Sequence, residues 1–123
     1  MSSRHERGRS GERAAERHLV RRGWTILDRR WRAAGGELDL VAARGRVVAM
    51  CEVKTRTDAE ALIEPLTAAQ RTRIARAAAA YLAGRPELRD RRVRIDLITV
   101  HPGRLRSRVR HHPGYAADLN ESR

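Results

Sequence analysis

The 123-residue chain contains no phenylalanine, and its only aromatic side chains are two tryptophans and two tyrosines. Proteins that hold unpaired bases do so largely by stacking them on several aromatic side chains. Four aromatic residues can hardly build such a platform. We therefore expect any contact with a nucleic acid to run mainly through the phosphate backbone.

Cysteine and long apolar runs are also scarce. Cys51 is the single cysteine, so no internal disulfide can form, and we expect it to be a small core residue. The sequence has no run of 18 apolar residues, which argues against a membrane span. Its first residues lack the apolar stretch of a signal peptide. We therefore expect a cytoplasmic protein that does not cross a membrane.

Acidic residues are few compared with basic ones. The 15 aspartates and glutamates stand against 27 lysines and arginines, which gives a formal net charge of +12. The charge is spread along the whole chain, which favours a folded basic surface over a disordered arm. The partners that fit are nucleic acid, an anionic membrane surface or an acidic protein. We favour nucleic acid. The alternative is that the arginine content is a compositional bias and that the protein has no polyanionic partner.

Lysine is almost absent as well, because Lys54 is the only lysine among the 27 basic residues. Lysine is a compact charge with three donors, whereas arginine is a planar fork. A site that touches one phosphate oxygen, or orients one water, can require a lysine. Its position two residues after Glu52 hints at such a site, although chance alone could place it there.

The length fits one domain with a modest core. We expect a flexible N-terminus over residues 1–9, a folded domain over 10–103 and a basic tail over 104–123 with a short final helix. The periodicity and the turn residues predict an α/β domain with a mixed sheet and the order α-β-β-β-α-β. The expected elements are a helix that Ser10 caps (10–22), strands (24–32, 37–43 and 47–55), a helix (67–83) and a strand (93–100).

Acidic residues gather on the second and third expected strands. Glu37 and Asp39 are two residues apart and should share a face, as should Glu52 and Lys54. Whether the two sets meet depends on the register of the hairpin. A two-residue turn at positions 44–45 would pair residues whose numbers sum to 89, and an odd sum brings the acidic sides together.

The apolar residues beside these acids are typical of a buried sheet, with Leu38 and Leu40 expected together on the face opposite Asp39. Two carboxylates roughly 4 Å apart repel by about 4 kcal/mol at an effective dielectric of roughly 20. Mg²⁺ or Mn²⁺ would offset this repulsion and activate a phosphoryl group and a water. Lys54 could then orient the attacking hydroxide or balance the transition state. The alternative is a solvated strand face with surface ion pairs.

The motifs GELDLVA at residues 36–42 and EVKTR at residues 52–56 resemble the YraN family of bacterial proteins, which are predicted endonucleases of the restriction-endonuclease-like fold. Supporting matches are Gly11-Glu12-x-x-Ala15 and the RIDLI segment at residues 94–98. The resemblance covers roughly residues 8–100 in the same order and spacing.

The resemblance implies a Mg²⁺-dependent endonuclease that acts on DNA. By analogy with the archaeal Holliday junction resolvases, it implies that the substrate is branched or otherwise structured DNA. It implies that Asp39 and Glu52 bind the metal, that Lys54 is the catalytic lysine and that Glu12 completes the site. Glu37 belongs to the motif as a further candidate ligand. Junction resolution would call for a homodimer. The alternatives are a non-catalytic nucleic-acid-binding module and a basic adaptor for an acidic protein.

Two positions depart from the family pattern. Gln70 stands where the family often has a lysine, and Ile95 replaces an aromatic residue. Phosphate contacts are expected from four arginines: Arg56, Arg71, Arg73 and Arg76. A solvated helix face explains the last three equally well. The pair His111-His112 is expected to be solvated in the tail and not to bind metal.

Overall fold

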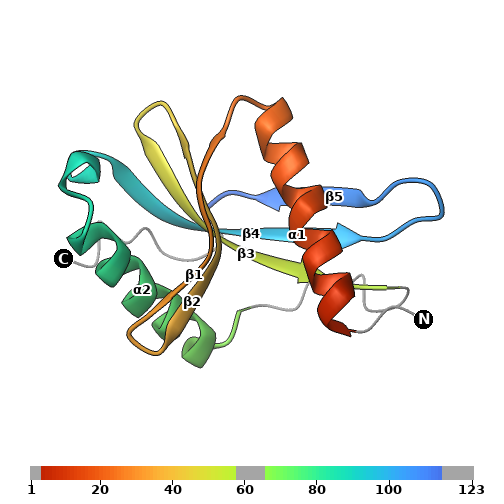
Figure 1. Ribbon diagram of the computed structural model, residues 1–123, viewed down its shortest axis with the longest axis horizontal. Coiled ribbons are helices and arrows are strands. Elements are labelled where there is room, and N and C mark those ends of the chain that lie inside the picture. The colour runs from red at the N-terminus through yellow and green to blue at the C-terminus, as the bar shows by residue number, and fades with distance from the viewer. Residues whose placement is uncertain (1–3, 58–65, 115–123) are drawn as a thin grey trace.

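The computed structural model of the protein describes residues 4–57 and 66–114, with the backbone alone for residues 4–7. Its elements in chain order are α1 (Arg4–Arg21), β1 (Thr25–Ala33), β2 (Gly36–Arg44), β3 (Val47–Thr55), α2 (Ala68–Ala83), the short 3-10 helix η2 (Pro86–Leu88), β4 (Arg92–His101) and β5 (Arg108–His112). One five-stranded sheet forms the centre, and α1 and α2 cover its opposite faces (Figure 1).

The expected α/β class and element order are confirmed. Strands β1, β2 and β3 form an antiparallel meander, and α2 then crosses over so that β4 runs parallel to β3. Strand β5 pairs antiparallel with β4 at the edge of the sheet. This mixed sheet is consistent with a restriction-endonuclease-like fold. Among the described residues, no helix is both long enough and apolar enough to cross a membrane.

The structure differs from expectation at both ends of the domain. Helix α1 begins at Arg4 instead of Ser10, because the segment before Ser10 includes three arginines and a glutamate, which are good helix formers. Residues 108–112, expected in a solvated tail, form β5, where Val109 lies opposite Val100 and packs against the core. The short helix expected near the end of the tail falls in residues 115–123, outside the described part of the chain.

Each helix buries one apolar side against the sheet. Ile74 and Tyr81 of α2 belong to one buried cluster, and Ala15 and Leu19 of α1 belong to the other. A fully buried side chain of the size of leucine contributes about 2 kcal/mol. Cys51 lies buried in the α1-side cluster, as expected of a small core residue.

The hairpin of β2 and β3 has the expected parity, but its turn lies one residue later than expected. Leu40 is opposite Cys51, so that paired residue numbers sum to 91 and not to 89. The turn consists of Gly45 and Arg46, and Gly45 takes a positive φ of 58°, which suits glycine at this place in a two-residue hairpin. Because the sum stays odd, the acidic sides of the two strands coincide as predicted.

The expectation that Leu38 and Leu40 share a face is wrong. Leu40 packs in the cluster beneath α1, whereas Leu38 packs in the cluster beneath α2. The described pairing of β2 with β3 ends at Leu40, so β2 twists away from β3 toward its start. This divergence opens the sheet at the place where the acidic residues lie.

Helix α1 approaches the end of β3 closely at Gly11. A Cβ atom at this position would collide with the Thr55 side chain, so the packing requires glycine. Glu12, the next residue along α1, is thereby brought near the end of the strand that carries Glu52 and Lys54.

Candidate active site

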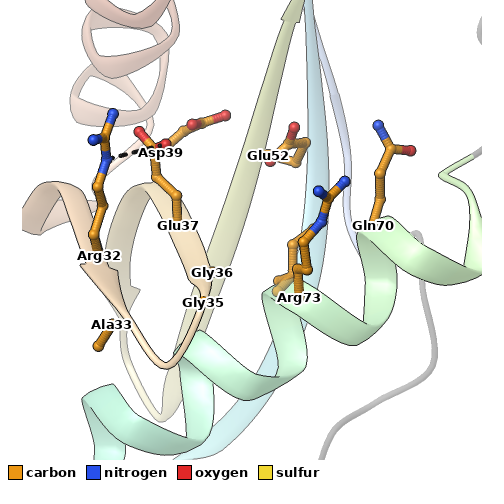
Figure 2. Close-up of a pocket in the computed structure, with 10 residues that line it drawn as sticks. Arg32, Ala33, Gly35, Gly36, Glu37, Asp39, Glu52, Gln70 and Arg73 are labelled. Carbon is orange, nitrogen blue, oxygen red and sulfur yellow. Dashed lines mark ion pairs between the residues drawn. The ribbon is translucent and has the colours of Figure 1, made fainter.

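A cavity of about 530 Å³ lies between the diverging strands β2 and β3 and the first turns of α2 (Figure 2). We call it the acidic cavity and define it by its polar lining residues: Arg32, Glu37, Asp39, Glu52, Gln70 and Arg73. Three strands and one helix contribute these side chains, so the cavity is a product of the tertiary fold.

Asp39 lies where the two strands separate. The Val53 backbone N–H donates a hydrogen bond to the Asp39 carboxylate, with a nitrogen–oxygen distance of 2.8 Å. The Asp39 carboxylate thus takes the place of the backbone carbonyl group that would accept this hydrogen bond if the pairing of β2 with β3 continued. This bond fixes the carboxylate between the strands and at the wall of the cavity.

The surroundings of Asp39 disfavour its charged form. Burial raises the pKa of Asp39 to about 8, and the negative charges of Glu52, Glu12 and Glu37 add to this effect. The hydrogen bond from Val53 acts in the opposite direction without reversing it. Asp39 is therefore a half-buried carboxyl group among other acids.

Glu52 shares this environment. Burial raises the pKa of Glu52, and the charges of Glu37 and Glu12 contribute in the same direction. A hydrogen bond with the Asp39 side chain and the positive charge of Lys54 lower the pKa of Glu52 in part. The fold thus brings Asp39 and Glu52 together, as the odd register predicts.

Lys54 follows two residues after Glu52 and lies on the same side of β3. Its relative exposure is 9%, which makes it one of two charged residues counted as buried within the described chain. Burying a charged lysine side chain to this extent costs desolvation free energy unless acidic groups surround it. The neighbouring carboxylates supply that environment.

Two further predicted acids are engaged by arginines. Glu37 lines the cavity and forms an ion pair with Arg32, with a nitrogen–oxygen distance of 3.3 Å (Figure 2). Glu12 accepts a hydrogen bond from Arg30 at 2.8 Å and is not among the residues that line the cavity. Within residues 4–57 and 66–114, no three Asp, Glu, His or Cys side chains converge closely enough to hold a metal ion. The candidate ligand set is thus Asp39 and Glu52.

Sequence reasoning missed the role of Arg30. This residue has a positive φ of 50° and lies between the strand positions paired with Leu40 and Leu38, hence opposite Asp39. A left-handed conformation at a non-glycine residue within a strand is a strained feature that is often found at functional sites. One arginine among 26 carries no signal in the sequence that would single it out.

Of the arginines expected to contact phosphates, Arg73 is the one that lines the acidic cavity. It points from α2 toward the cavity beside Gln70 (Figure 2). Gln70 also completes a capping box with Thr67, since each side chain bonds the backbone N–H of the other residue. Arg71 and Arg76 are exposed on α2 outside the cavity, and Arg56 follows the end of β3.

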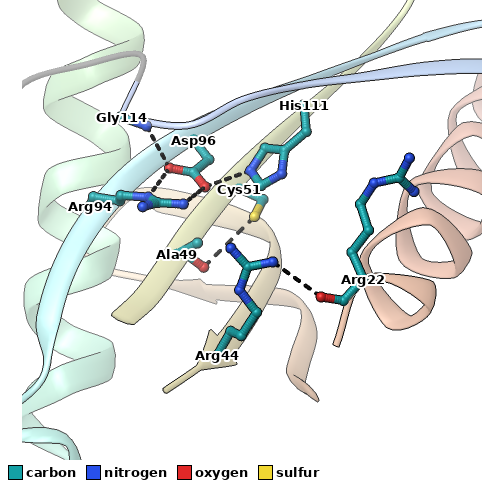
Figure 3. A network of polar contacts seen from close by, with 8 residues as sticks. All are labelled: Arg22, Arg44, Ala49, Cys51, Arg94, Asp96, His111 and Gly114. Atoms are coloured by element: carbon teal, nitrogen blue, oxygen red, sulfur yellow. Dashed lines mark hydrogen bonds and ion pairs between the residues drawn. The ribbon is translucent and has the colours of Figure 1, made fainter. Parts of the chain in front are cut away.

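A second aspartate of the sheet, Asp96 of β4, lies beside Cys51 of β3 and is held in a network of polar contacts (Figure 3). Asp96 is completely buried and accepts bonds from Arg94 at 2.9 and 3.2 Å and from the Gly114 backbone N–H at 2.8 Å. His111 Nε2 lies 2.6 Å from the same carboxylate. Although burial raises the pKa of Asp96, the bonds to His111, Arg94 and Gly114 lower it below its ordinary value.

The expectation that His111 is solvated is therefore wrong. Its side chain is 12% exposed and is bound to Asp96, because the returning chain adds β5 beside β4. The ring also makes an edge contact with Trp24, with 5.8 Å between the ring centroids. The position of His111 could not be predicted without the strand pairing.

Fold and cavity together define a small α/β protein of the restriction-endonuclease-like kind, with a carboxylate pair where the interior strands β2 and β3 of its sheet separate. The chain is 40% identical over 110 residues to a UPF0102 protein of Kineococcus radiotolerans. The aligned region covers 87% of this chain and 90% of the relative. It is 47% identical over 103 residues to a UPF0102 protein of Paramagnetospirillum magneticum, with 80% of each chain covered. A UPF0102 protein of Caulobacter sp. strain K31 is 46% identical over 97 residues, covering 79% of this chain and 70% of the relative.

The profile of the uncharacterised protein family UPF0102 matches residues 11–100. The chain therefore belongs to UPF0102, which is the YraN family that its motifs resemble. The matched region contains Glu12, Asp39, Glu52 and Lys54 and ends within β4. The link between β4 and β5, and β5 itself, lie beyond it.

Proposed function

We propose that the protein is a nuclease that hydrolyses phosphodiester bonds in DNA with Mg²⁺ or Mn²⁺ as its cofactor. The observation that carries this proposal is the pair of half-buried carboxylates, Asp39 and Glu52. Within the described residues, no arginine or histidine forms an ion pair with either of them. Lys54 beside Glu52 adds the lysine that the acid-x-Lys motif requires.

The donor set fits a hard divalent cation. Mg²⁺ keeps several waters and is commonly held by one or two carboxylates together with substrate phosphate oxygens, which matches the two carboxylates of this cavity. Such an ion would also offset the repulsion between Asp39 and Glu52. When bound, it would supply Lewis acidity at the phosphoryl group and lower the pKa of a water.

The protein's own residues would position the substrate and the water. The Lys54 ammonium can donate to the attacking water or to a phosphate oxygen whose charge grows in the transition state. Arg73 and Gln70 face the carboxylates across the acidic cavity, where they can donate to phosphate oxygens. Arg56, Arg71 and Arg76 would extend the contact along the backbone.

A second candidate is a non-catalytic nucleic-acid-binding module with the same fold. The observation that favours it is the ion pair of Glu12 with Arg30, which keeps the helix-borne acid out of the cavity lining. Activity in the first proposal therefore requires either that two carboxylates suffice or that Glu12 leaves Arg30 when the cation binds.

The test is cleavage of supercoiled plasmid and of four-way junction DNA in Mg²⁺ and in Mn²⁺. Asp39→Asn and Lys54→Ala should each reduce the rate by on the order of 10³-fold, which corresponds to about 4 kcal/mol of transition-state stabilisation. Asp90→Asn is the matched control, since Asp90 is an exposed acid outside the cavity. Binding without any cleavage by the parent protein would favour the non-catalytic module. Resolution of junctions would in addition require a dimer.

A further inference from the structure

Two acids of helix α1, Glu12 and Glu16, are paired with arginines of β1, whereas two of its arginines line a cavity elsewhere. Glu16 accepts two hydrogen bonds from Arg29 of β1, at 2.6 and 2.8 Å, and Glu12 likewise is held by an arginine of β1. Arg17 and Arg21 lie on the side toward the link between β4 and β5. In the described part of the chain, no acid forms an ion pair with either of these two arginines.

A second cavity, of about 600 Å³, lies between α1 and this link. We call it the basic groove and define it by six of its lining residues: Arg17, His18, Arg21, Leu105, Arg106 and Val109. No acid among residues 4–57 and 66–114 lines it. Burial lowers the pKa of His18, and the positive charges of Arg22, His111 and Arg21 lower it further, as expected where positive potential accumulates.

An exposed leucine stands at one wall of the basic groove. Leu105 is 98% exposed and lies between Arg104 and Arg106 in the link from β4 to β5. The link is a closely packed turn, because a Cβ at Gly103 would collide with the Arg106 carbonyl oxygen. The turn therefore exposes the apolar Leu105 side chain to solvent, where it contributes nothing to the core. Proteins that bend nucleic acids use such side chains, flanked by cations, as wedges between base steps.

The basic groove and the acidic cavity lie near the same ends of strands β3 and β4 but on the two faces of the sheet. Strands β3 and β4 are parallel, with Lys54 opposite Thr99, so the link to β5 leaves β4 at the strand end that is nearer the acidic site. Helix α2 forms one wall of the acidic cavity, and helix α1 forms one wall of the basic groove. A polyanion that contacts both must pass around these strand ends or must branch there.

We propose that the basic groove is a second contact site for nucleic acid, in which phosphates lie against Arg17, Arg21 and Arg106 and Leu105 inserts at an interrupted base step. This inference deepens the proposed function and rests on it for the choice of DNA as the partner. It assigns as substrate a DNA whose stacking is already broken, such as a junction or a fork, because a wedge enters there at the lowest cost.

The test measures binding in EDTA, so that cleavage does not enter. Fluorescence anisotropy compares a four-way junction with a linear duplex of the same base composition. Leu105→Ala should lower the affinity for the junction about tenfold and leave that for the duplex unchanged. The double variant Arg17→Gln/Arg21→Gln should weaken both complexes about tenfold and reduce the salt slope by about 2. A 2-aminopurine at the branch point should brighten with the parent protein and not with Leu105→Ala.

The matched controls are Val20→Ala, which removes the other large exposed apolar side chain among the described residues, and Arg89→Gln, which removes an exposed arginine beyond the opposite end of β4. The inference is overturned if the Leu105 and arginine variants bind both DNAs as these controls do. It is also overturned if Leu105→Ala changes the oligomeric state and not the preference for the junction. A protein that shows the expected binding and never cleaves would end the nuclease proposal and leave this inference in place.

Discussion

Two aspartates within the sheet, Asp96 and Asp39, have opposite surroundings. Asp96 is completely buried and accepts bonds from an arginine, a histidine and a backbone N–H, and its pKa is lowered. Asp39 accepts one backbone N–H and lies beside Glu52, and its pKa is raised to about 8. The fold itself neutralises the first carboxylate and leaves the second among other negative charges.

This difference separates a structural acid from a functional one. Removing a buried charge that is fully paired leaves its partners unpaired, so the fold should suffer. Removing a charge that is crowded by like charges relieves repulsion, so the fold should not suffer while the chemistry does. Both aspartates sit in apolar strand segments, and the sequence alone does not distinguish them in this respect.

The largest effect is expected on catalysis, from changes at the crowded pair. Glu52→Gln, like Asp39→Asn, should reduce DNA cleavage by on the order of 10³-fold. The midpoint of urea unfolding should stay equal to that of the parent or rise, because one like charge is gone. The distinction between Asp39 as a functional acid and Asp96 as a structural one is contradicted if either variant loses activity only because it unfolds. Circular dichroism of the same samples would reveal such unfolding.

The next effect is on stability, from the paired aspartate. Asp96→Ala should lower the free energy of unfolding by about 3–5 kcal/mol, since Arg94 loses its buried counter-charge and His111 loses its hydrogen-bond partner. This is a large part of the roughly 5–15 kcal/mol available to a small domain, so His111→Ala serves as a milder variant. Urea unfolding of both variants measures the loss. A loss as small as that of the exposed control Asp90→Asn would show that the network is not structural.

The smallest effect is on the pH dependence of stability. The folded-state pKa of Asp96 is below its ordinary value, so its ionised form adds stability that is present above about pH 4 and is lost as the pH falls through the folded pKa. The difference in unfolding free energy between the parent and Asp96→Asn should therefore be larger at pH 5 than at pH 2.5. Urea titrations at the two pH values measure it, and a difference that grows on acidification would contradict the assignment.

Much of the candidate site could be predicted from local patterns. The spacing of Glu52 and Lys54 on an alternating strand places both on one side, and the odd register of the hairpin follows from any even number of turn residues. The start and end of α2 were also readable, because Thr67 caps the helix and Gly84 follows its last residue. These features depend on residues close together in the sequence.

The rest depends on contacts between distant segments. Strand β2 separates from β3 because it twists, and this twist moves Leu38 to the other face of the sheet. The alternation of apolar and polar residues along the strand does not predict it. The strained backbone of Arg30 and the pairing of β5 with β4 appear only when the sheet is assembled. In the sequence Asp96 stands out only as part of the RIDLI segment that resembles the family, and only the structure reveals the groups that bind it.

The central claim is that Asp39 and Glu52, with which no arginine or histidine of the described chain forms an ion pair, are a site for a divalent cation. Electron paramagnetic resonance of a Mn²⁺ titration counts the ions bound to the full chain without DNA. We expect saturable binding by the parent and by Asp90→Asn, competed by Mg²⁺, and its loss in Asp39→Asn and Glu52→Gln. Binding by these two variants equal to that of the parent, or no binding by the parent with junction DNA added, would contradict the account.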